Sequence, residues 1–595
     1  MCGIIGSYIS NNDKDLESKL FKNGLNQIKH RGPDYQENID LKLNNNNRFL
    51  LGFCRLSIQD LSRSANKIFR DQNNVLLFNG EIYNHLELKK KYFNNKYFQT
   101  NTDTEFLFNF LKRYGMEKID ELDGMFAFAW IDLKIKKLFL ARDRTGVKTL
   151  YYYYNNKNFH FCSEAWYLYE NLKEKKINFN ALNFYLRYGF NHNQICIAKN
   201  IFKVQPGEIL EYNLDDNILK FNTYLKNENT LIKNDYENLD NDLADAVKLN
   251  LISDVKIGTF LSGGIDSSII TILSNKFNKK IDAFTNYFND QSFYKKNYDF
   301  LYAEKLCKNF DIRFNYNLIN IDQNTKDNFF NVLSFFDEPL ANLNILNSFL
   351  QAKTAKEMNI KVILTGDGAD EIFGGYTKYV NTKISDKFYF LSFLSKKIRQ
   401  YQNYDLNFFP LLFFEKFNDQ DIKNLFKSEV AKQILESNSH FYISKDSTNR
   451  NFISNNFDFK CWLTGDHNFK LDRTLMANSI EGRVPFQSNN IIKKYYHIDI
   501  NKKINFFNTK IQLRKNNILP NQFNQRPKQG WHLPEKWFVN NIMKDSFFEL
   551  VDKSNFLNHN QAKDLFNKSK YPKIQVYKII TLYMLMYWNR KTNFF

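Results

Sequence analysis

The chain has 595 residues, which is too many for one hydrophobic core, so we expect at least two domains. Apolar residues make up 43% of the chain and charged residues 25%, a composition that excludes a disordered protein. The formal charge of +19 would suit a nucleic acid or an anionic membrane, but the lysines are scattered rather than clustered. We therefore expect solvated surface lysines, no nucleic-acid partner and no membrane partner.

The cysteines and the N-terminus indicate where the protein works. The six cysteines lie far apart, and no two have the spacing of zinc ligands, which suits a reducing compartment. The first residues lack the basic stretch and apolar run of a signal peptide, and no stretch is long and apolar enough to cross a bilayer. We therefore expect a cytoplasmic protein.

The first third of the chain has the pattern of antiparallel β-structure with tight turns. Short apolar runs alternate with turn dipeptides such as Asn79-Gly80. A polar stretch over 226–234 is the expected linker to a second domain. The strands predicted before it cover 3–10, 73–78, 125–132, 134–142, 149–154, 158–162 and 208–212.

Beyond the linker, the pattern changes to alternating strands and helices. Apolar residues recur at helical spacing from Leu239 to Leu251. A predicted strand over 255–261 leads through a glycine turn at 262–268 into a predicted helix over 269–277. Another predicted strand, 361–365, ends in a second glycine-rich turn. This order predicts an α/β domain with a parallel sheet and with ligands at the carboxyl ends of its strands.

Cys2 directly follows the initiator methionine. A small second residue usually lets that methionine be removed, and Cys2 would then carry both a thiol and a free α-amino group. The pKa of such an amine is about 7.7–8.0, so it can act as the base for the thiol without a histidine. Taken alone, an incidental cysteine is the simpler interpretation.

Four motifs that follow Cys2 in order change that interpretation. Together they resemble the class II, N-terminal-nucleophile glutamine amidotransferases over about the first third of the chain. The Asn79 amide and the Gly80 N–H can donate hydrogen bonds to the tetrahedral oxyanion of glutamine hydrolysis. The resemblance implies that Arg55 binds the α-carboxylate of glutamine and that Asp103, helped by Glu81, binds its α-amino group. The motifs are His30-Arg31-Gly32-Pro33-Asp34, Arg55-Leu56-Ser57-Ile58, Asn79-Gly80-Glu81-Ile82-Tyr83-Asn84 and Thr102-Asp103.

The glycine turn at 262–268 has the features of a phosphate site. Its glycines let the backbone approach a phosphate, and its N–H groups and helix N-terminus favour an anion. It lacks the Gly-Lys-Ser/Thr of the Walker motif and resembles the PP-loop of ATP pyrophosphatases, which adenylate a carboxylate. This resemblance implies ATP as a substrate, with Mg²⁺ bound by Asp266. The residues expected at ATP are Leu261, Ser262, Gly263, Gly264, Asp266, Ser267, Ser268, Thr365, Gly366 and Lys528.

The second glycine-rich turn, 365–376, contains three carboxylates within five positions. Like charges so close favour a bound cation, and Mg-pyrophosphate is a natural partner. The turn resembles a loop of the glutamine-hydrolysing asparagine synthetases, which implies that Asp370 binds Mg²⁺ and that Asp367 lies near the reacting carboxylate. Further segments extend this resemblance over nearly the whole chain. They imply that Lys528 counters the charge of the leaving pyrophosphate, and that the aspartate and adenylate site includes Asp337, Glu338 and Arg483.

Three residues depart from the family pattern. Thr145 and Thr149 stand where Phe and Pro are usual, and Gln487 follows Phe486 where Leu-Asp is typical. These departures bear on the path between the domains and on the acceptor pocket rather than on the class of reaction. The aromatic, lysine-rich segment 383–447 has helical periodicity and no recognisable chemistry.

These observations predict an α/β multi-domain protein. Residues 2–220 are expected to form an αββα Ntn-hydrolase sandwich of antiparallel sheets that works as a glutaminase. Residues 235–595 are expected to form a PP-loop domain of the adenine nucleotide alpha hydrolase type, with a parallel sheet and C-terminal helices. The implied partners are glutamine, aspartate and ATP, and a homodimer is common in such families. The implied reaction makes L-asparagine through β-aspartyl-AMP and releases AMP, pyrophosphate and glutamate.

Three other interpretations stay open. A related amidotransferase would act on another carboxylate, such as a sugar acid or a specialised metabolite. A non-catalytic protein with a relic fold is opposed by the presence of Cys2, Asp266 and Asp370. A nucleic-acid binder, suggested by the charge alone, lacks a recognisable reading module.

Overall fold

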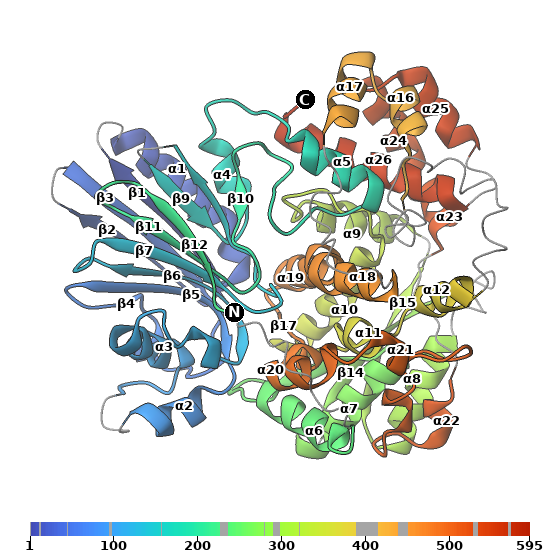
Figure 1. Cartoon of the computed structure of the whole chain (residues 1–595), viewed down its shortest axis with the longest axis horizontal. Coiled ribbons are helices and arrows are strands. Elements are labelled where there is room, and N and C mark those ends of the chain that lie inside the picture. Colours follow the sequence, from blue (N-terminus) through green and yellow to red (C-terminus); the bar gives the residue numbers. More distant parts are fainter. Residues whose placement is uncertain are drawn as a thin grey trace.

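The computed structural model describes residues 2–10, 14–43, 46–93, 98–155, 158–225, 236–278, 280–289, 298–320, 322–387, 415–437, 450–526, 534–568 and 573–595. The expected linker, 226–234, lies outside these residues. The N-terminal half contains two antiparallel sheets, at the left of Figure 1, and the C-terminal half contains one parallel sheet with many helices, at the right.

The two N-terminal sheets each have six strands and pack face to face. Their inner faces share one core, with Ile4 and Leu51 from the first sheet against Leu77, Ala129 and Leu140 from the second. The first sheet has the order β10 (Phe202–Lys203), β8 (Tyr151–Tyr154), β9 (Phe159–Cys162), β1 (Cys2–Ser10), β3 (Asn47–Arg55) and β2 (Tyr35–Lys42). The second has the order β12 (Leu219–Thr223), β11 (Glu208–Asn213), β7 (Lys137–Arg142), β6 (Gly124–Asp132), β5 (Asn74–Ile82) and β4 (Phe69–Arg70).

Helices cover the outer face of each sheet. On the first sheet, α1 (Lys14–Gln27) and α4 (Trp166–Glu170) pack against the face that carries Ile5 and Ile9. On the second, α2 (His85–Tyr92) and α3 (Asp103–Tyr114) join the core of Phe78 and Phe126. The αββα sandwich is therefore confirmed. The predicted strands 125–132 and 134–142 correspond to the antiparallel pair β6 and β7, and 149–154 and 158–162 to the pair β8 and β9.

The parallel sheet of the second half is also confirmed. Its order is β15 (Arg313–Ile319), β14 (Asp282–Phe288), β13 (Ile257–Phe260), β16 (Val362–Leu364) and β17 (Glu481–Arg483), and every pair is parallel. Val362 and Leu364 point to the face covered by α6 (Leu239–Asn250), α7 (Ile265–Phe277) and α8 (Tyr298–Asn309). Ile363 points to the other face, covered by α10 (Asn344–Glu357) and α19 (Phe469–Met476). The helix predicted over 269–277 begins earlier, at Ile265, because the glycine turn closes directly into its first residue.

Further helices belong to the C-terminal part, drawn from yellow to red in Figure 1. Of the segment 383–447, residues 383–387 end α12 (Thr377–Lys387), and 415–437 contain α16 (Asp419–Leu425) and α17 (Ser428–Glu436). The rest of that segment lies outside the described residues. Further helices include α18 (Arg450–Phe457), the π-helical segment Asp458–Asn468, α24 (Lys544–Asp552), α25 (His559–Lys568) and α26 (Lys573–Thr592). Among the described helices, none combines the length and the apolar character that crossing a membrane needs.

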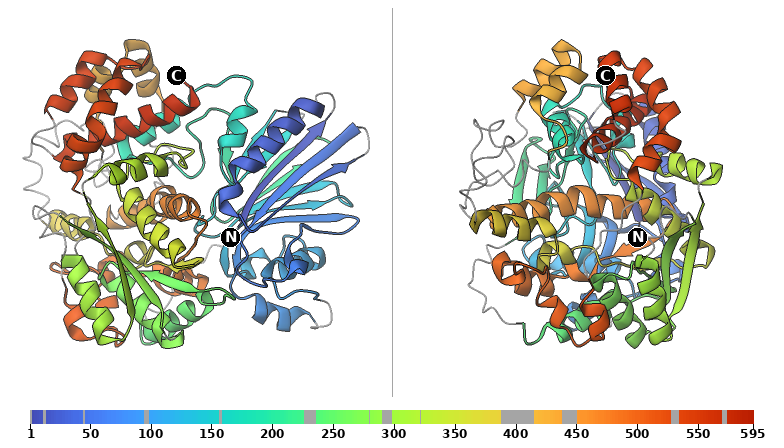
Figure 2. Two further views of the ribbon diagram at one scale, coloured as in Figure 1. Left: turned by 180° about the vertical axis from the view of Figure 1, so that it is seen from behind. Right: turned by 90° about the vertical axis from the view of Figure 1, so that its right-hand side faces the viewer.

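The chain's N-terminal end lies between the two halves, as both the front and the back view show (Figures 1 and 2). Cys2 opens β1, and its carbonyl oxygen accepts a hydrogen bond from Arg31, which is paired with Asp472 of α19. The expected nucleophile is therefore next to the surface on which the two halves meet.

Candidate active site

Cys2, the first residue of β1, and Asn79, which lies within β5 of the other sheet, come together. The Cys2 backbone nitrogen donates to Asn79 Oδ1 over 3.1 Å, and the Cys2 side chain is buried. Asn79 Nδ2 is buried too and has no hydrogen-bond partner among the described residues. A buried amide donor without a partner costs free energy, so it is poised to bind an oxygen of a ligand.

Gly80 permits the close packing beside this pair. A Cβ at residue 80 would lie 2.2 Å from the carbonyl oxygen of Met125 on the neighbouring strand β6, which no side chain can tolerate. The position therefore requires glycine. Its N–H also lies directly after the free Asn79 amide in the chain, in keeping with two donors for one oxyanion.

The Cys2 thiol is held protonated by its surroundings. Burial raises its pKa, while the positive chain terminus, a backbone hydrogen bond at Leu56 and the charge of Arg55 act in the opposite direction. A thiol of raised pKa is a poor nucleophile unless a base takes its proton. The α-amino group of an N-terminal Cys2 would be such a base.

Arg55 lies opposite Cys2 on the neighbouring strand, and hydrogen bonds hold its side chain in place. Its Nη2 donates to the carbonyl oxygens of Gln59, at 2.9 Å, and Asp60, at 2.8 Å, and its Nη1 donates to Asn66. These contacts fix the plane of the guanidinium. A fixed guanidinium is suited to a planar carboxylate.

Glu81 and Asp103 place two buried carboxylates in the same site. Asp103 Oδ2 accepts from the Ile82 N–H at 2.9 Å, and Glu81 bonds to Gln59. Burial raises the pKa of both groups, and the charge of Asp103 raises the pKa of Glu81 further. Two buried carboxylates that disfavour each other's charge are stabilised by a cation, such as the ammonium group of an amino acid.

The phosphate-type turn lies between β13 and α7, as predicted from the sequence. Gly263 has φ +69°, and a Cβ there would lie 2.5 Å from the carbonyl oxygen of Asp299. Ser262 and Ser267 face each other with their Oγ atoms 3.0 Å apart. The turn opens onto a cavity of about 910 Å³ whose wall includes Ser262, Gly264, Asp266, Ser267, Thr365, Gly366, Asp367 and Asp370.

Three residues predicted at ATP do not line this cavity. Leu261 is buried, and its backbone N–H donates to the carbonyl oxygen of Phe284. Gly263 and Ser268 belong to the turn but do not line the cavity. Lys528 lies outside the described residues.

Lys510 is a cavity residue that sequence reasoning missed. Its Nζ lies 2.5 Å from Asp266 Oδ2 and 2.5 Å from Asp370 Oδ1, and the side chain is almost fully buried. Burial works against the charge of Lys510, but the two carboxylates outweigh it, so the pKa is raised. Nothing in the sequence distinguishes Lys510 from the many surface lysines, because its role follows only from the fold.

The two carboxylates also fit a magnesium ion held jointly with substrate phosphates. Asp266 Oδ1 is buried and has no hydrogen-bond partner among the described residues, and Lys510 shows that the position between Asp266 and Asp370 favours a cation. No group of three or more His, Cys, Asp or Glu side chains suited to a metal occurs among the described residues. Magnesium commonly needs only one or two carboxylates when phosphates supply the other ligands, so the residues fit.

Asp367 lies in the cavity, whereas the other residues predicted at the aspartate site do not. Thr365 Oγ1 donates to Asp367 Oδ2 at 2.7 Å and orients it. Asp337, Glu338 and Arg483 are fully buried and do not line the cavity. Each is engaged in buried ion pairs where the two halves meet, and their contact with the acceptor stays a prediction.

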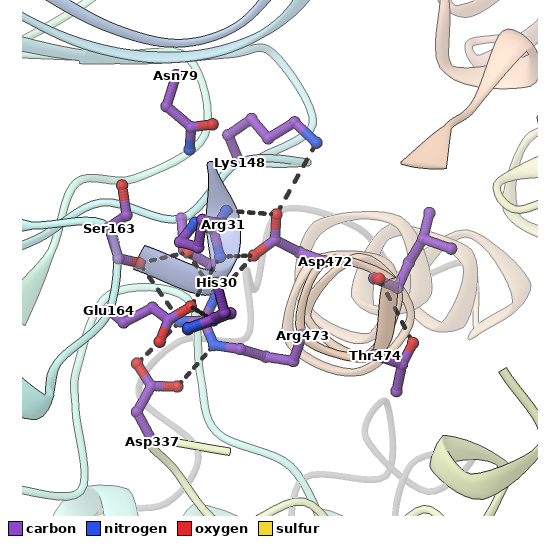
Figure 3. A network of polar contacts seen from close by, with 12 residues as sticks. His30, Arg31, Asn79, Lys148, Ser163, Glu164, Asp337, Asp472, Arg473 and Thr474 are labelled. Atoms are coloured by element: carbon purple, nitrogen blue, oxygen red, sulfur yellow. Dashed lines mark hydrogen bonds and ion pairs between the residues drawn. The ribbon is translucent and has the colours of Figure 1, made fainter. Parts of the chain in front are cut away.

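Figure 3 shows the centre of this contact between the halves. Arg31 forms a two-pronged ion pair with Asp472, at 2.8 and 2.9 Å, and also bonds to Glu164 at 2.9 Å. Arg473 pairs with Asp337 through two bonds of 2.8 Å. The bidentate pair of Arg31 and Asp472 ties the surroundings of Cys2 to α19, whose residue Lys470 lines the large cavity.

The three departures from the family pattern also lie at this contact. Arg473 donates to Thr149 Oγ1 at 3.0 Å. Asn468 Nδ2 donates to the Thr145 carbonyl oxygen and to Gln487 Oε1, both at 3.0 Å. The Thr149 hydroxyl and the Gln487 amide therefore each have a partner where the halves meet, whereas the contact at Thr145 is made by its backbone.

Comparison with known proteins agrees with this division. The sequence model described as "Glutamine amidotransferase domain" matches residues 1–225, and the one described as "Asparagine synthase" matches residues 238–590. A glutamine amidotransferase domain joined to a phosphate-loop domain of this kind defines a glutamine-dependent ligase. Asparagine synthetase [glutamine-hydrolyzing] 1 of Bacillus subtilis is 28% identical, over 93% of this chain and 90% of its own length.

Two further relatives carry similar names. A putative asparagine synthetase [glutamine-hydrolyzing] 2 of Methanocaldococcus jannaschii is 31% identical over 64% of this chain and 76% of its own length. A putative asparagine synthetase of Mycobacterium bovis is 26% identical over 85% and 83%. The chain belongs to the asparagine synthase family, because the family's match alone spans more than half of its residues.

Proposed function

We propose that this protein makes L-asparagine from L-aspartate, glutamine and ATP. One observation carries the proposal: the chain contains two sites. The first has Cys2 beside an amide donor without a partner among the described residues, and the second is a cavity lined by the phosphate-type turn and the acidic loop. ATP use and the amino-acid substrates are in keeping with the family.

In the first site, the Cys2 thiol attacks the side-chain amide carbon of glutamine. The α-amino group of Cys2 takes the thiol proton and then delivers it to the departing ammonia. The oxyanion accepts hydrogen bonds from Asn79 Nδ2 and the Gly80 N–H, and one such donor lowers the barrier by about 3 kcal/mol. Water then hydrolyses the thioester to glutamate.

Three charged residues orient glutamine for this attack. The guanidinium of Arg55 binds the α-carboxylate, and Glu81 and Asp103 bind the α-ammonium group. The ammonium group also relieves the repulsion between the two buried carboxylates. Free glutamine would thus be preferred over an amide that lacks either charged group.

In the second site, the side-chain carboxylate of aspartate attacks the α-phosphate of ATP, giving β-aspartyl-AMP and pyrophosphate. The turn at 262–268 binds the phosphates, and Asp367 lies next to the acceptor. Asp266 and Asp370 would hold Mg²⁺, which neutralises phosphate charge when bound. Lys510 supplies a fixed positive charge beside the same phosphates.

Ammonia from the first site then displaces AMP and yields asparagine. Ammonia released into water would be protonated and lost, and water reaching the adenylate would hydrolyse it. We therefore infer that ammonia passes inside the protein, across the contact between the halves.

Product analysis tests the proposal. Purified protein is supplied with Mg-ATP, glutamine and a panel of carboxylates that includes aspartate, and the products are identified by mass spectrometry. Asparagine together with AMP, pyrophosphate and glutamate is the expected result. Glutamate without asparagine, and AMP only with another carboxylate, would keep the two sites and replace aspartate as the acceptor.

A further inference from the structure

Arg483 touches both sites at once. It is the last residue of β17, the edge strand of the parallel sheet, and pairs in register with Leu364 of β16. Its carbonyl oxygen accepts a hydrogen bond from the Thr365 N–H at 2.9 Å. Because Thr365 in turn holds Asp367, the backbone of Arg483 supports the start of the acidic loop in the large cavity.

The side chain of Arg483 points the opposite way, into the glutamine site. Its Nη2 lies 3.4 Å from Glu81 Oε2, and this ion pair joins the two halves of the protein. The rest of the guanidinium is fixed by its own half, since Nε bonds to Glu481 at 2.6 Å and Nη1 to the carbonyl oxygens of Asn250 and Ile252 at 2.7 Å. No solvent reaches the side chain.

The contact with Glu81 is the loosest of these interactions. Nη2 has no hydrogen-bond partner among the described residues, so the 3.4 Å pair has room to shorten. A small shift of β17 would therefore change this contact before it changed the others. The Arg483 charge also favours the ionised form of Glu81, because it lowers a carboxyl pKa that burial and Asp103 raise.

We propose that Arg483 is a positioning residue that couples glutamine binding to the state of the ATP and acceptor cavity. When substrates order the acidic loop, the Thr365 contact moves β17, and Arg483 tightens on Glu81. Glu81 then presents its charge to the α-ammonium group of glutamine. The inference rests on the proposed function, since it requires glutamine in one site and ATP with an acceptor in the other.

Arg31 also joins the two halves, but it contacts a different kind of group. Arg31, paired with Asp472, ends on the backbone carbonyl of Cys2 at 3.3 Å, whereas Arg483 ends on a side chain proposed to bind substrate. A change at a substrate-binding carboxylate alters affinity directly. Arg483 is therefore the stronger candidate for coupling the two sites. The ion pairs of Arg31 and Arg473 are the stronger candidates for holding the two halves together.

The test uses the full chain and three activities: glutamine hydrolysis alone, glutamine hydrolysis with Mg-ATP and aspartate, and asparagine synthesis from ammonium. The variants are Arg483→Gln and Arg483→Lys. The matched control is Lys361→Gln, which breaks another ion pair between the halves, Lys361 to Asp34 at 2.8 Å, that involves neither Glu81 nor a residue lining the large cavity.

We expect the wild-type protein to hydrolyse glutamine with a lower KM when Mg-ATP and aspartate are present. In Arg483→Gln this response should disappear, the KM for glutamine should rise by about tenfold, within the usual range of coupling between sites, and more glutamate should form per asparagine. Synthesis from ammonium in the same variant reports on the second site alone, and its rate should change less than the KM for glutamine, because the backbone contact with Thr365 remains. Lys361→Gln should behave like wild type in all three assays.

Two outcomes separate the inference from the function on which it rests. A wild-type protein that makes no asparagine from aspartate would overturn the proposed function. The coupling role alone would be overturned if the wild-type protein makes asparagine and folded Arg483→Gln still responds to Mg-ATP and aspartate as the wild type does. If circular dichroism shows that Arg483→Gln is unfolded, the Arg483→Lys variant decides the question. Lysine keeps the charge but cannot reach Glu81 and Glu481 together. A full wild-type response in Arg483→Lys would therefore also refute the inference.

Discussion

The two sites of this protein are built in opposite ways. The proposed glutamine site is buried, and its main residues come from three strands and the start of α3, each within a short motif of the sequence. The ATP and acceptor site is a cavity of about 910 Å³ whose wall is collected from segments as far apart as 188–190, 262–267, 365–371 and 509–526. A tight site suits one small, invariant substrate, whereas a large wall drawn from many segments leaves room for variation in the acceptor.

The sharpest way to separate the two sites is to remove the nucleophile. Cys2→Ala should reduce glutamine-dependent synthesis by at least about 10³-fold, because no other group can form the thioester. Synthesis from ammonium should persist, since the second cavity contains no atom of Cys2. Both activities are measured by asparagine formation, and loss of both in a folded variant would contradict the division of labour.

Asp266→Ala should produce the reverse pattern. It removes a carboxylate proposed to hold the metal and leaves Lys510 with one carboxylate partner fewer. AMP formation should fall by about 10³-fold, while hydrolysis of glutamine alone continues. Asp254→Asn, a change in an exposed loop carboxylate, is the control, and retained AMP formation in Asp266→Ala would remove Asp266 from the metal site.

A smaller effect is expected from Asn79→Ala, which tests the tight site without removing its nucleophile. Loss of one oxyanion donor should lower kcat for glutamine hydrolysis by about 10²-fold and leave the KM within a few-fold. A stopped or coupled glutamate assay measures both constants. A KM that rises by about 10²-fold while kcat is unchanged would instead assign Asn79 to substrate binding.

This contrast also explains what could be predicted from the sequence. The antiparallel strands, the parallel sheet and the turn at 262–268 follow from local patterns, because each depends on neighbours in the chain. The sandwich and the site of Cys2 and Asn79, which join residues 77 positions apart, were predicted only from the resemblance to a known family. Lys510 was missed, since its pairing with Asp266 joins residues 244 positions apart. The contact of Arg483 with the acceptor stays a prediction, and its closeness to Glu81 of the other half could not be foreseen from the sequence, because it depends on how the two halves pack.

The mildest predicted effect concerns the contact between the sites rather than either site. Burial alone would raise the pKa of Glu164, but the charges of His30, Arg473 and Arg31 outweigh it and lower that pKa to about 2. A carboxyl group whose pKa is lower in the folded protein stabilises it above its unfolded pKa, near about 4.3, and the stabilisation disappears as the pH falls through that window toward about 2.

By pH 3 the lost stabilisation amounts to about 2 kcal/mol, so the melting temperature of the wild-type protein should fall between pH 6 and pH 3. Glu164→Gln should melt at a lower temperature near neutral pH and should show less of the acid dependence. Thermal melts from pH 6 to pH 3 measure both, with Glu174→Gln as the control, because Glu174 pairs with Lys176 at the exposed surface. An acid dependence identical in Glu164→Gln and wild type would show that the buried pairs of Figure 3 do not set the stability of the contact.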